Sequence, residues 1–224
     1  MAAKRTVLIT GASRGIGKAI ASRYLEGGYK ILTPTRQELD LASAESVRSF
    51  TVRLKDTPVD VLINNAGENP IAEISSLDLS LWERSLSVNL TAPFLLIQHA
   101  SAHMVQRGWG RIVNISSCYS LVARYGRAAY GAAKGGLNAL TRTAALEYAP
   151  CDILVNAVCP GFVETDMTIT NNTSEQIAAL RQSVPLRRLA RPGEIADCVF
   201  FLGSEQNTYI TGQTLVVDGG FLCQ

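Results

Sequence analysis

The sequence contains few charged residues and no block of one sign. Charged residues make up 18% of the 224 residues, with 21 Lys and Arg against 19 Asp and Glu. Nucleic acids and anionic membrane surfaces attract clustered positive charge, so we expect neither as a partner. The longest apolar runs, such as residues 94–97, fall far short of the ~18 residues that a membrane span needs.

The start of the sequence also lacks the pattern of a secretory signal. Residues 1–5 are followed by a short apolar run and then by the glycine turn that begins at Gly11. This leaves no room for the apolar region of a signal peptide. We therefore expect a soluble, cytoplasmic protein.

Disulfide and zinc patterns are missing as well. The five cysteines are odd in number and form no C-x-x-C pair, which favours free thiols in a reducing compartment. His99 and His103 stand four residues apart, a spacing that suits zinc on a helix. No glutamate follows His99 and no third ligand is evident, so we expect surface histidines and no metal site.

What the sequence does contain is an alternation of short apolar runs with longer amphipathic stretches. This is typical of βαβ units and a parallel sheet. Runs that are apolar throughout indicate strands covered on both faces by helices. We predict an α/β fold, a single-domain doubly wound parallel sheet (Rossmann fold) spanning residues 1–224, with strands near residues 6–9, 30–33, 59–64, 110–115, 153–158 and 214–217.

One predicted connection is unusually short. Residues 34–42 separate the strand at 30–33 from a helix expected at 43–55. A parallel crossover normally needs ~10–12 residues or more, usually with a helix. We expect a short strand at 39–41 reached without a full helix; the alternative is a sheet that loses a strand here.

A glycine-rich turn follows the first predicted strand and opens the first helix. Its glycines are Gly11, Gly15 and Gly17, in the spacing G-x-x-x-G-x-G. Glycines allow a tight turn and a close approach to a pyrophosphate, whose charge then lies on free N–H groups at a helix N-terminus. A glycine triplet alone is a weak signal, but its place between strand and helix predicts a dinucleotide site.

The charges near this turn favour NADP(H) over NAD(H). NAD sites usually carry an acid about ~20 residues after the glycines, which binds the ribose 2′-hydroxyl. Here the end of the second strand offers Arg36, and Arg14 lies within the glycine turn. Two guanidinium groups suit a 2′-phosphate. Glu38 lies close by in the sequence, and its negative charge counts against a 2′-phosphate. NAD(H) is therefore the alternative cofactor.

Tyr130 and Lys134 stand four residues apart, so they share one face of a helix. A nearby ammonium favours the phenolate, and we expect it to lower the pKa of Tyr130 toward neutrality. A tunable phenol suits a general acid for carbonyl reduction. Small residues around this pair predict room for a ligand, and the Ser117 hydroxyl lies where it can orient a carbonyl.

Pro93 predicts a break in the helix expected over residues 79–106. Proline lacks an N–H, so it cannot bond the carbonyl four residues earlier, which belongs to Asn89. A carbonyl freed in this way can hold a water near a site. The alternative is an ordinary proline kink.

With these motifs the sequence resembles the short-chain dehydrogenase/reductase family over nearly its whole length. The matching pieces are residues 10–17, Asp40, residues 64–67, Asn89, Ser117, Tyr130 with Lys134, residues 160–165 and residues 209–220. The segment at 34–40 departs from the family, most members of which carry a full helix there.

The resemblance implies specific roles. Tyr130 would be the acid/base, Ser117 would polarise the carbonyl, Lys134 would tune Tyr130 and hold the nicotinamide ribose, and Asn89 would join a proton relay. Thr165 would meet the nicotinamide carboxamide, and Asp40 the adenine. The full set of implied cofactor-binding residues is Gly11, Ser13, Arg14, Gly15, Ile16, Gly17, Arg36, Asp40, Leu41, Asn65, Ala66, Gly67, Tyr130, Lys134, Pro160, Gly161, Val163 and Thr165.

The expected activity is reversible reduction of a ketone to a secondary alcohol by direct hydride transfer. The final segment and the four catalytic positions most resemble 3-oxoacyl-acyl-carrier-protein reductases, which implies fatty acid biosynthesis and a homotetramer or homodimer. A sugar or polyol dehydrogenase is the first alternative. A non-catalytic dinucleotide sensor is disfavoured, since it would not need all four catalytic positions.

Arginines near the expected substrate entrance bear on this choice. Arg124 and Arg127 precede Tyr130, and Arg187, Arg188 and Arg191 follow a stretch at 166–188 that we interpret as a lid or a packed helical excursion. These cations either dock an anionic carrier or are solvated charges that need no partner.

Overall fold

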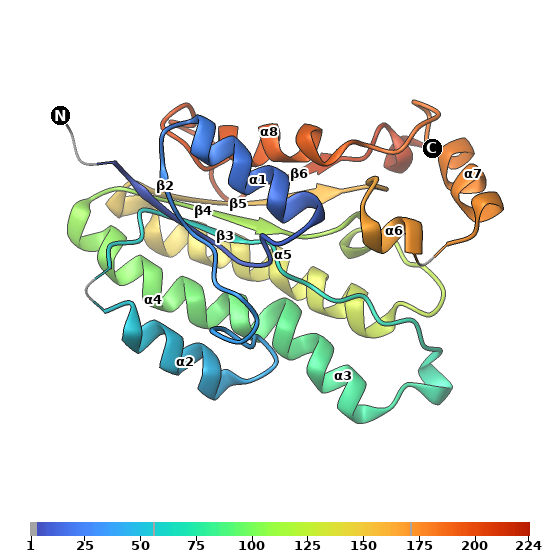
Figure 1. Ribbon diagram of the computed structural model, residues 1–224, viewed down its shortest axis with the longest axis horizontal. Coiled ribbons are helices and arrows are strands. Elements are labelled where there is room, and N and C mark those ends of the chain that lie inside the picture. Colours follow the sequence, from blue (N-terminus) through green and yellow to red (C-terminus); the bar gives the residue numbers. More distant parts are fainter. Residues whose placement is uncertain (1–3, 56, 171) are drawn as a thin grey trace.

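The computed structural model describes residues 4–55, 57–170 and 172–224 (Figure 1). Within these residues six strands form one sheet in the order β2-β1-β3-β4-β5-β6, and every neighbouring pair is parallel. The strands are β1 (Thr6–Ile9), β2 (Lys30–Leu32), β3 (Val61–Asn64), β4 (Gly110–Ile115), β5 (Ile153–Pro160) and β6 (Thr214–Val217). The predicted doubly wound α/β fold is confirmed.

Helices cover both faces of this sheet (Figure 1). One face is covered by α1 (Gly15–Glu26) and α8 (Pro192–Leu202). The other is covered by α2 (Ala44–Arg53), α4 (Ala92–Arg107) and α5 (Ala128–Tyr148). The other α-helices of the described residues are α3 (Leu79–Leu86), α6 (Asp166–Thr170) and α7 (Ser174–Ser183).

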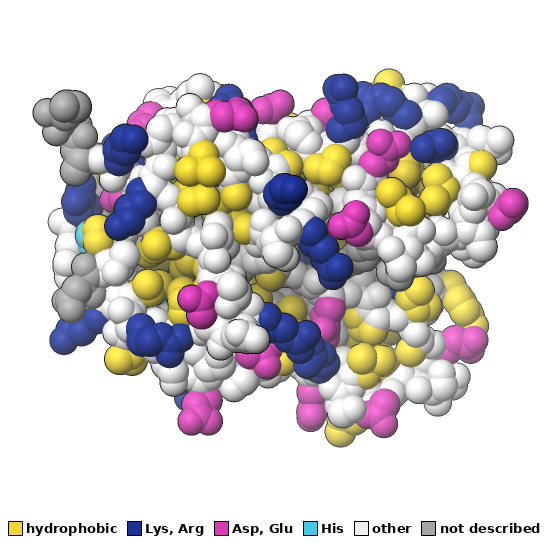
Figure 2. Space-filling model, viewed as in Figure 1, with side chains coloured by type: hydrophobic (Ala, Val, Ile, Leu, Met, Phe, Trp, Pro, Cys, Tyr) yellow, Lys and Arg dark blue, Asp and Glu magenta, His cyan; other side chains and the backbone are white. Residues whose placement is uncertain are grey.

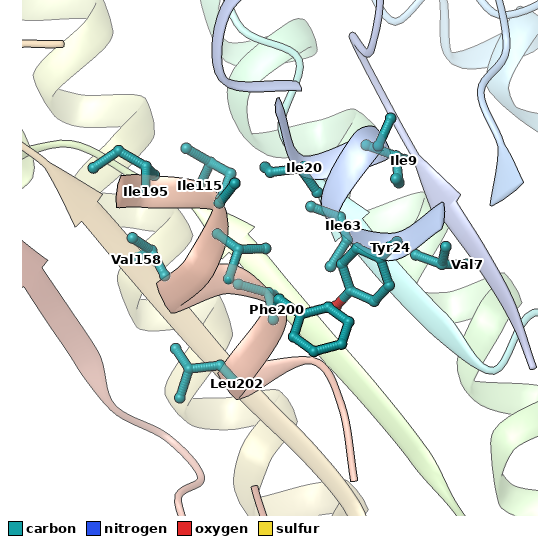
Figure 3. Close-up of a cluster of buried hydrophobic side chains, with 14 of the residues drawn as sticks. Val7, Ile9, Ile20, Tyr24, Ile63, Ile115, Val158, Ile195, Phe200 and Leu202 are labelled. Atoms are coloured by element: carbon teal, nitrogen blue, oxygen red, sulfur yellow. The ribbon is translucent and has the colours of Figure 1, made fainter. Parts of the chain in front are cut away.

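Two apolar layers hold these helices to the sheet. In the layer beneath α1 and α8, Tyr24 is fully buried, and its ring meets that of Phe200 edge-on at a centroid distance of 5.1 Å (Figure 3). In the opposite layer Leu96 and Met104 of α4 pack with Ile153 of β5. Strands β1, β3, β4 and β5 are buried throughout, as their apolar sequences predict.

The short strand expected at 39–41 is absent, and that prediction was wrong. The Glu38 carboxylate accepts hydrogen bonds from the N–H and hydroxyl of Thr35, both at 2.8 Å, and closes a turn. Leu39 is buried in the apolar layer that includes α2 residues. Ser43 then caps α2 by accepting the N–H of Ser46. The alternative is therefore correct: the sheet loses a strand here and β2 is its edge.

The helix expected over 79–106 is interrupted close to Pro93. A π-helical turn at Ser87–Thr91 separates α3 from α4, and Ala92 donates its N–H to the carbonyl of Ser87, five residues earlier. Such π turns occur frequently at functional sites. Asn89 lies within the turn and is fully buried.

The strand order creates a switch point between β1 and β3, because β2 lies on one side of β1 and all later strands lie on the other. Open parallel sheets bind ligands at such a point, outside the carboxyl ends of their strands. The glycine turn follows β1 and Asn65 follows β3 at this edge. Ser117 and Gly161 follow β4 and β5, so their segments reach the same edge.

The surface carries mixed charge on the face drawn in Figure 2, where basic and acidic side chains are interspersed. In the part of the chain that the structure describes, no helix is long and apolar enough to cross a membrane. Nor does any group of three His, Cys, Asp or Glu side chains there come together as a metal site would require.

Candidate active site

The glycine turn forms a cradle that larger residues could not form. Gly11 and Gly15 have φ angles of +67° and +54°, in the region that favours glycine. A Cβ at Gly17 would lie 2.1 Å from the carbonyl oxygen of Gly11. Asn65 fixes the turn by donating its side-chain amide to the carbonyl of Thr10 at 2.9 Å. The first N–H groups of α1, which a helix leaves without intrahelical partners, lie at the edge of the sheet that holds the switch point.

Two adjoining cavities open at this edge of the sheet. One, of about 400 Å³, is lined by Ser117, Tyr130 and Lys134. The other, of about 680 Å³, lies beside the loop after β2. Both are bordered by Gly11, Ser13, Arg14, Ala66, Gly67, Glu68, Asn69 and Asp166. Together they form a site long enough for an extended ligand.

Most of the predicted site residues line these two cavities. The smaller cavity is lined by Gly11, Ser13, Arg14, Gly15, Ile16, Gly17, Asn65, Ala66, Gly67, Ser117, Tyr130, Lys134, Pro160, Gly161, Val163 and Thr165. The larger one adds Arg36, Asp40 and Leu41. Asn89 lines neither cavity and lies directly behind Gly67, where a Cβ would be 2.8 Å from its Oδ1 atom.

Tyr130 differs from expectation in its protonation. Burial raises its pKa to about 12, and the neighbouring Ser117 hydroxyl opposes that rise only in part. The predicted lowering of this pKa is wrong for this structure, because desolvation of the buried phenol raises it. A phenol with this pKa carries its proton at neutral pH, which is the state that a proton donor needs.

Lys134 is buried near the Tyr130 ring. Its ammonium donates a hydrogen bond to the carbonyl of Ile115 at 2.7 Å and lies 5.7 Å from the centre of the Tyr130 ring. Desolvation lowers its pKa to about 8. Lys134 therefore remains mostly charged at neutral pH, but a modest rise in pH removes that charge.

Asn89 has one unpaired polar atom. Its amide nitrogen donates to the carbonyls of Glu68 and Ser85 at 2.9 and 3.0 Å. Its Oδ1 atom is buried without a partner among the described residues. A Cβ at Gly67 would lie 3.5 Å from the Lys134 ammonium as well as close to this oxygen. The unpaired oxygen and the cation therefore lie on the same side of Gly67.

Glycines of α5 make room for neighbouring protein segments and not, as predicted, for a ligand. A Cβ at Gly131 would lie 3.3 Å from the carbonyl oxygen of Tyr119, and a Cβ at Gly136 would lie 2.9 Å from the Leu90 side chain. These glycines let neighbouring protein segments approach the helix. Space for a ligand comes instead from the cavity over Tyr130.

Two guanidinium groups line the larger cavity at the expected adenine end. Arg14 borders both cavities, and Arg36 lines the larger one. Glu38 lines neither cavity, because its carboxylate is held by Thr35 in the turn described above. Asp40 does line the larger cavity and accepts the N–H of Ala42 at 3.1 Å. From the sequence, the negative charge of Glu38 weakens the preference for NADP(H). In the structure Glu38 lies outside both cavities, so it weakens that preference less.

Sequence reasoning missed Glu68 and Phe162. Glu68 borders both cavities and forms an ion pair with Arg84 of α3 at 3.0 Å. Phe162 lines the smaller cavity and packs edge-on against Phe221 near the end of the chain, with 5.0 Å between ring centroids. Glu68 follows the recognised motif at residues 64–67, and Phe162 lies within the recognised segment at residues 160–165, so those motifs were the available signal.

The outer arginines are engaged with the protein itself. Arg188 and Arg191 pair with Glu194, at 2.7 and 3.5 Å, and Arg187 bonds the carbonyl of Gln182. None of the three lines either cavity, whereas Arg124 and Arg127 do line the smaller one. The stretch interpreted as a lid contains α6 and α7, and Leu180 of α7 reaches the smaller cavity. Residue 171, within that stretch, lies outside the described residues.

Comparisons with known proteins agree with this architecture. A family model described as short chain dehydrogenase matches residues 5–49, and a second, described as Enoyl-(Acyl carrier protein) reductase, matches residues 33–222. The chain is 38% identical to the 3-oxoacyl-[acyl-carrier-protein] reductase FabG of Aquifex aeolicus, with 95% of each chain covered.

Solved structures of dehydrogenases also match this chain over nearly its whole length. The structure of 4-hydroxyisoleucine dehydrogenase complexed with NADH has a TM-score of 0.93, 28% identity, and covers 99% of this chain and 100% of its own. A second structure, from Beutenbergia cavernae, is provisionally described as an NAD(P)-dependent gluconate 5-dehydrogenase with bound NADP. It has a TM-score of 0.90 and 33% identity, and the match covers 100% of this chain and 99% of its own. The chain is thus an oxidoreductase and belongs to the short-chain dehydrogenase/reductase family.

Proposed function

We propose that this chain, as a single catalytic domain spanning residues 1–224, reduces a ketone to a secondary alcohol with NADP(H) as cofactor. The observation that carries the proposal is a shared cavity. The Tyr130 phenol, the Ser117 hydroxyl and the Lys134 ammonium line the same cavity as the glycine turn. A proton donor and a dinucleotide site are therefore adjacent.

The residues at the switch point fit a nicotinamide dinucleotide. Side chains at Gly11 or Gly17 would collide with protein atoms, so the tight turn requires glycine, and the N–H groups at the start of α1 suit a pyrophosphate. Arg14 and Arg36 suit the 2′-phosphate, with Asp40 and Leu41 at the adenine end. Lys134, Asn65, Gly67 and Thr165 would hold the nicotinamide end. When bound, the cofactor supplies the hydride for the substrate carbon or accepts it in the reverse direction.

Side chains of the protein would supply the proton and replace it. Ser117 would donate a hydrogen bond that orients the carbonyl oxygen, and Tyr130 would give that oxygen its proton. Lys134 would stabilise the resulting phenolate through its positive charge. The unpaired Oδ1 atom of Asn89, behind Gly67, fits a role in returning a proton to Lys134 through water.

Replacing Arg36 with Asp should reverse the cofactor preference. The change removes a guanidinium from the 2′-phosphate, adds like-charge repulsion, and offers the 2′-hydroxyl of NADH an acceptor. We expect kcat/KM to fall for NADPH and to rise for NADH, which steady-state kinetics with both cofactors will measure. Arg48, exposed on α2 and outside both cavities, provides the matched control Arg48→Asp. An unchanged preference in Arg36→Asp would mean that Arg36 does not contact the ribose.

Two substrate classes follow from different observations. The identity to 3-oxoacyl-acyl-carrier-protein reductases supports a 3-oxoacyl thioester on an anionic carrier, as used in fatty acid biosynthesis. The identity to a protein described as a gluconate 5-dehydrogenase supports a hydroxylated acid or polyol. A non-catalytic dinucleotide sensor is the least supported reading, because all four catalytic positions are present.

A substrate panel tests the proposed reaction. Purified protein should oxidise NADPH in the presence of at least one ketone from a panel of 3-oxoacyl thioesters, 3-oxo acids, keto-sugar acids and neutral ketones. The reaction is followed by the loss of NADPH absorbance. The reverse direction should reduce NADP⁺ with the matching alcohols. Tight NADPH binding without turnover of any member would favour the sensor instead.

A homo-oligomer and a cytoplasmic location complete the proposal. Apolar side chains stay exposed on α4, α5 and β6, at Phe94, Val105, Leu146, Leu215 and Val216. Exposed apolar patches often mark contacts with a second subunit, so light scattering should report a dimer or tetramer. The five free cysteines suit a reducing compartment.

A further inference from the structure

Arg124 is fixed in the wall of the smaller cavity without an acidic partner. Its guanidinium donates a hydrogen bond to the Tyr119 hydroxyl at 2.7 Å. It also lies over two aromatic rings, 5.7 Å from the centre of Tyr119 and 6.0 Å from that of Phe162. Contacts of this kind hold the group in place without neutralising it. The charge therefore remains available to a ligand.

Arg127 is held beside it in a similar way. Its guanidinium donates to the backbone carbonyl of Asn69 at 2.9 Å and to the Asn69 side-chain oxygen at 2.8 Å. Desolvation and the charge of Arg124 both lower the pKa of Arg127, and Arg127 in turn lowers that of Tyr130. Arg124 thus lies near enough for its charge to affect Arg127, and Arg127 lies near enough to affect Tyr130, the expected proton donor.

The acidic residues around this cavity do not neutralise the pair. Within the described residues no carboxylate oxygen lies within 4.0 Å of Arg124 or Arg127. Glu68 and Asp166 also line the cavity, but Glu68 pairs with Arg84 at 3.0 Å and Asp166 forms no ion pair with either arginine among the described residues. Arg127 is partly buried and Arg124 is exposed, so the desolvation cost falls on Arg127, and a bound anion would offset it. This arrangement is what a binding site for an anion requires.

We infer that Arg124 and Arg127 bind a carboxylate of the substrate itself, so that the enzyme acts on a free oxo acid and its hydroxy-acid product. Planar guanidinium groups bind carboxylates through paired, charge-assisted hydrogen bonds. The inference rests on the proposed function, and it chooses between the two substrate classes. A thioester of the same acid is neutral at the position where the free acid carries its charge.

The pair also explains how the substrate would be oriented. A carboxylate held at Arg124 and Arg127 leaves the remainder of a small acid within the cavity of about 400 Å³ that contains Ser117 and Tyr130. Anchoring one end of a substrate in this way restricts the positions of its carbonyl and favours reaction. Phe162 supplies an apolar wall beside the same pair.

The test is equilibrium binding, because binding does not require turnover. Protein loaded with NADP⁺ is titrated by calorimetry with pyruvate, acetoacetate and levulinate, which place the ketone one to three carbons from the carboxylate, and with the methyl ester of each. We expect at least one acid to bind more tightly than its ester. The Arg124→Gln and Arg127→Gln variants should each weaken that acid about 10- to 100-fold, as expected for lost hydrogen bonds to a charged group.

Two controls separate this inference from the proposed function. Arg142→Gln removes an exposed arginine of α5 that lines neither cavity, and it should leave acid binding and turnover unchanged. Ester binding shows whether each variant keeps an intact cavity. An absence of NADPH oxidation with every substrate would contradict the proposed function, whatever the titrations give.

Three results would overturn the inference. The first is that no acid binds more tightly than its ester. The second is that the acid binds equally well to wild type and to both variants. The third is that acetoacetyl carrier protein binds tightly and depends on the two arginines whereas the free acids do not, which would assign the pair to carrier docking.

Discussion

Tyr130→Phe should reduce kcat by at least the ~10²–10⁴ that general acid catalysis typically contributes. The phenyl ring keeps the shape of the cavity but has no proton to give to the carbonyl oxygen. The pKa of about 12 at Tyr130 means that the wild-type phenol is protonated across the neutral range. The loss should therefore be similar at pH 6 and pH 8, and the affinity for NADPH should change little.

Tyr125→Phe is the matched control for this variant. Tyr125 is 79% exposed and lines neither cavity, so loss of its hydroxyl should leave kcat unchanged. Steady-state rates and fluorescence titration with NADPH measure both quantities. Near-normal turnover by Tyr130→Phe would show that another group supplies the proton.

Lys134→Met should produce the second large effect, and it should act in opposite directions on activity and stability. Loss of the ammonium near Tyr130 removes a fixed charge that would stabilise the phenolate, and removing preorganised groups of this kind typically costs about 10²–10³ in kcat. Methionine has a similar volume and fills the same buried space. The variant should therefore stay folded while turnover falls.

The effect on stability follows from the pKa of Lys134. Its folded pKa of about 8 lies below its ordinary value of 10.5, so the folded state binds protons less readily than the unfolded state. This penalty is fully present below pH 8, amounts to roughly 3 kcal/mol from the shift, and disappears as the pH rises past the unfolded value. The hydrogen bond from Lys134 to Ile115 offsets part of it.

We therefore expect Lys134→Met to be at least as stable as the wild type at pH 7, and to lose most of that advantage at pH 10. Urea unfolding of both proteins at the two pH values measures the difference in the free energy of unfolding. A variant that is less stable than the wild type by the same margin at both pH values would contradict the account. It would mean that burial of the Lys134 charge does not destabilise the folded protein.

Much of the fold could be predicted because its signals are local. Uniformly apolar runs indicated the buried strands, and the glycine spacing after β1 placed the start of α1 near Gly17, whereas it begins at Gly15. Pro93 marked the interruption at Asn89, although the sequence did not show that the break would be a π turn. The missing strand at 39–41 depended on a side chain, since the Glu38–Thr35 turn competes with an extended conformation that the apolar pattern alone favours.

The candidate site was harder to predict in its energetics than in its composition. The motifs identified the residues that line the cavities, but the protonation of Tyr130 depends on burial, which no sequence pattern measures. The same applies to Arg124 and Arg127, whose proposed role depends on the absence of a carboxylate within 4.0 Å of either guanidinium in the described residues. Glycines of α5 were misread because a small residue admits a protein segment as readily as a ligand.

The most direct test of the central claim follows the hydride itself. NADPH carrying deuterium at C4, prepared separately on each face of the nicotinamide ring, is incubated with the enzyme and the best ketone from the panel. The account predicts that one of the two preparations yields an alcohol with a single deuterium on its carbinol carbon by mass spectrometry, and that Tyr130→Phe forms this product far more slowly. An alcohol whose carbinol hydrogen comes from the solvent with both preparations, or no alcohol from any ketone, would contradict it.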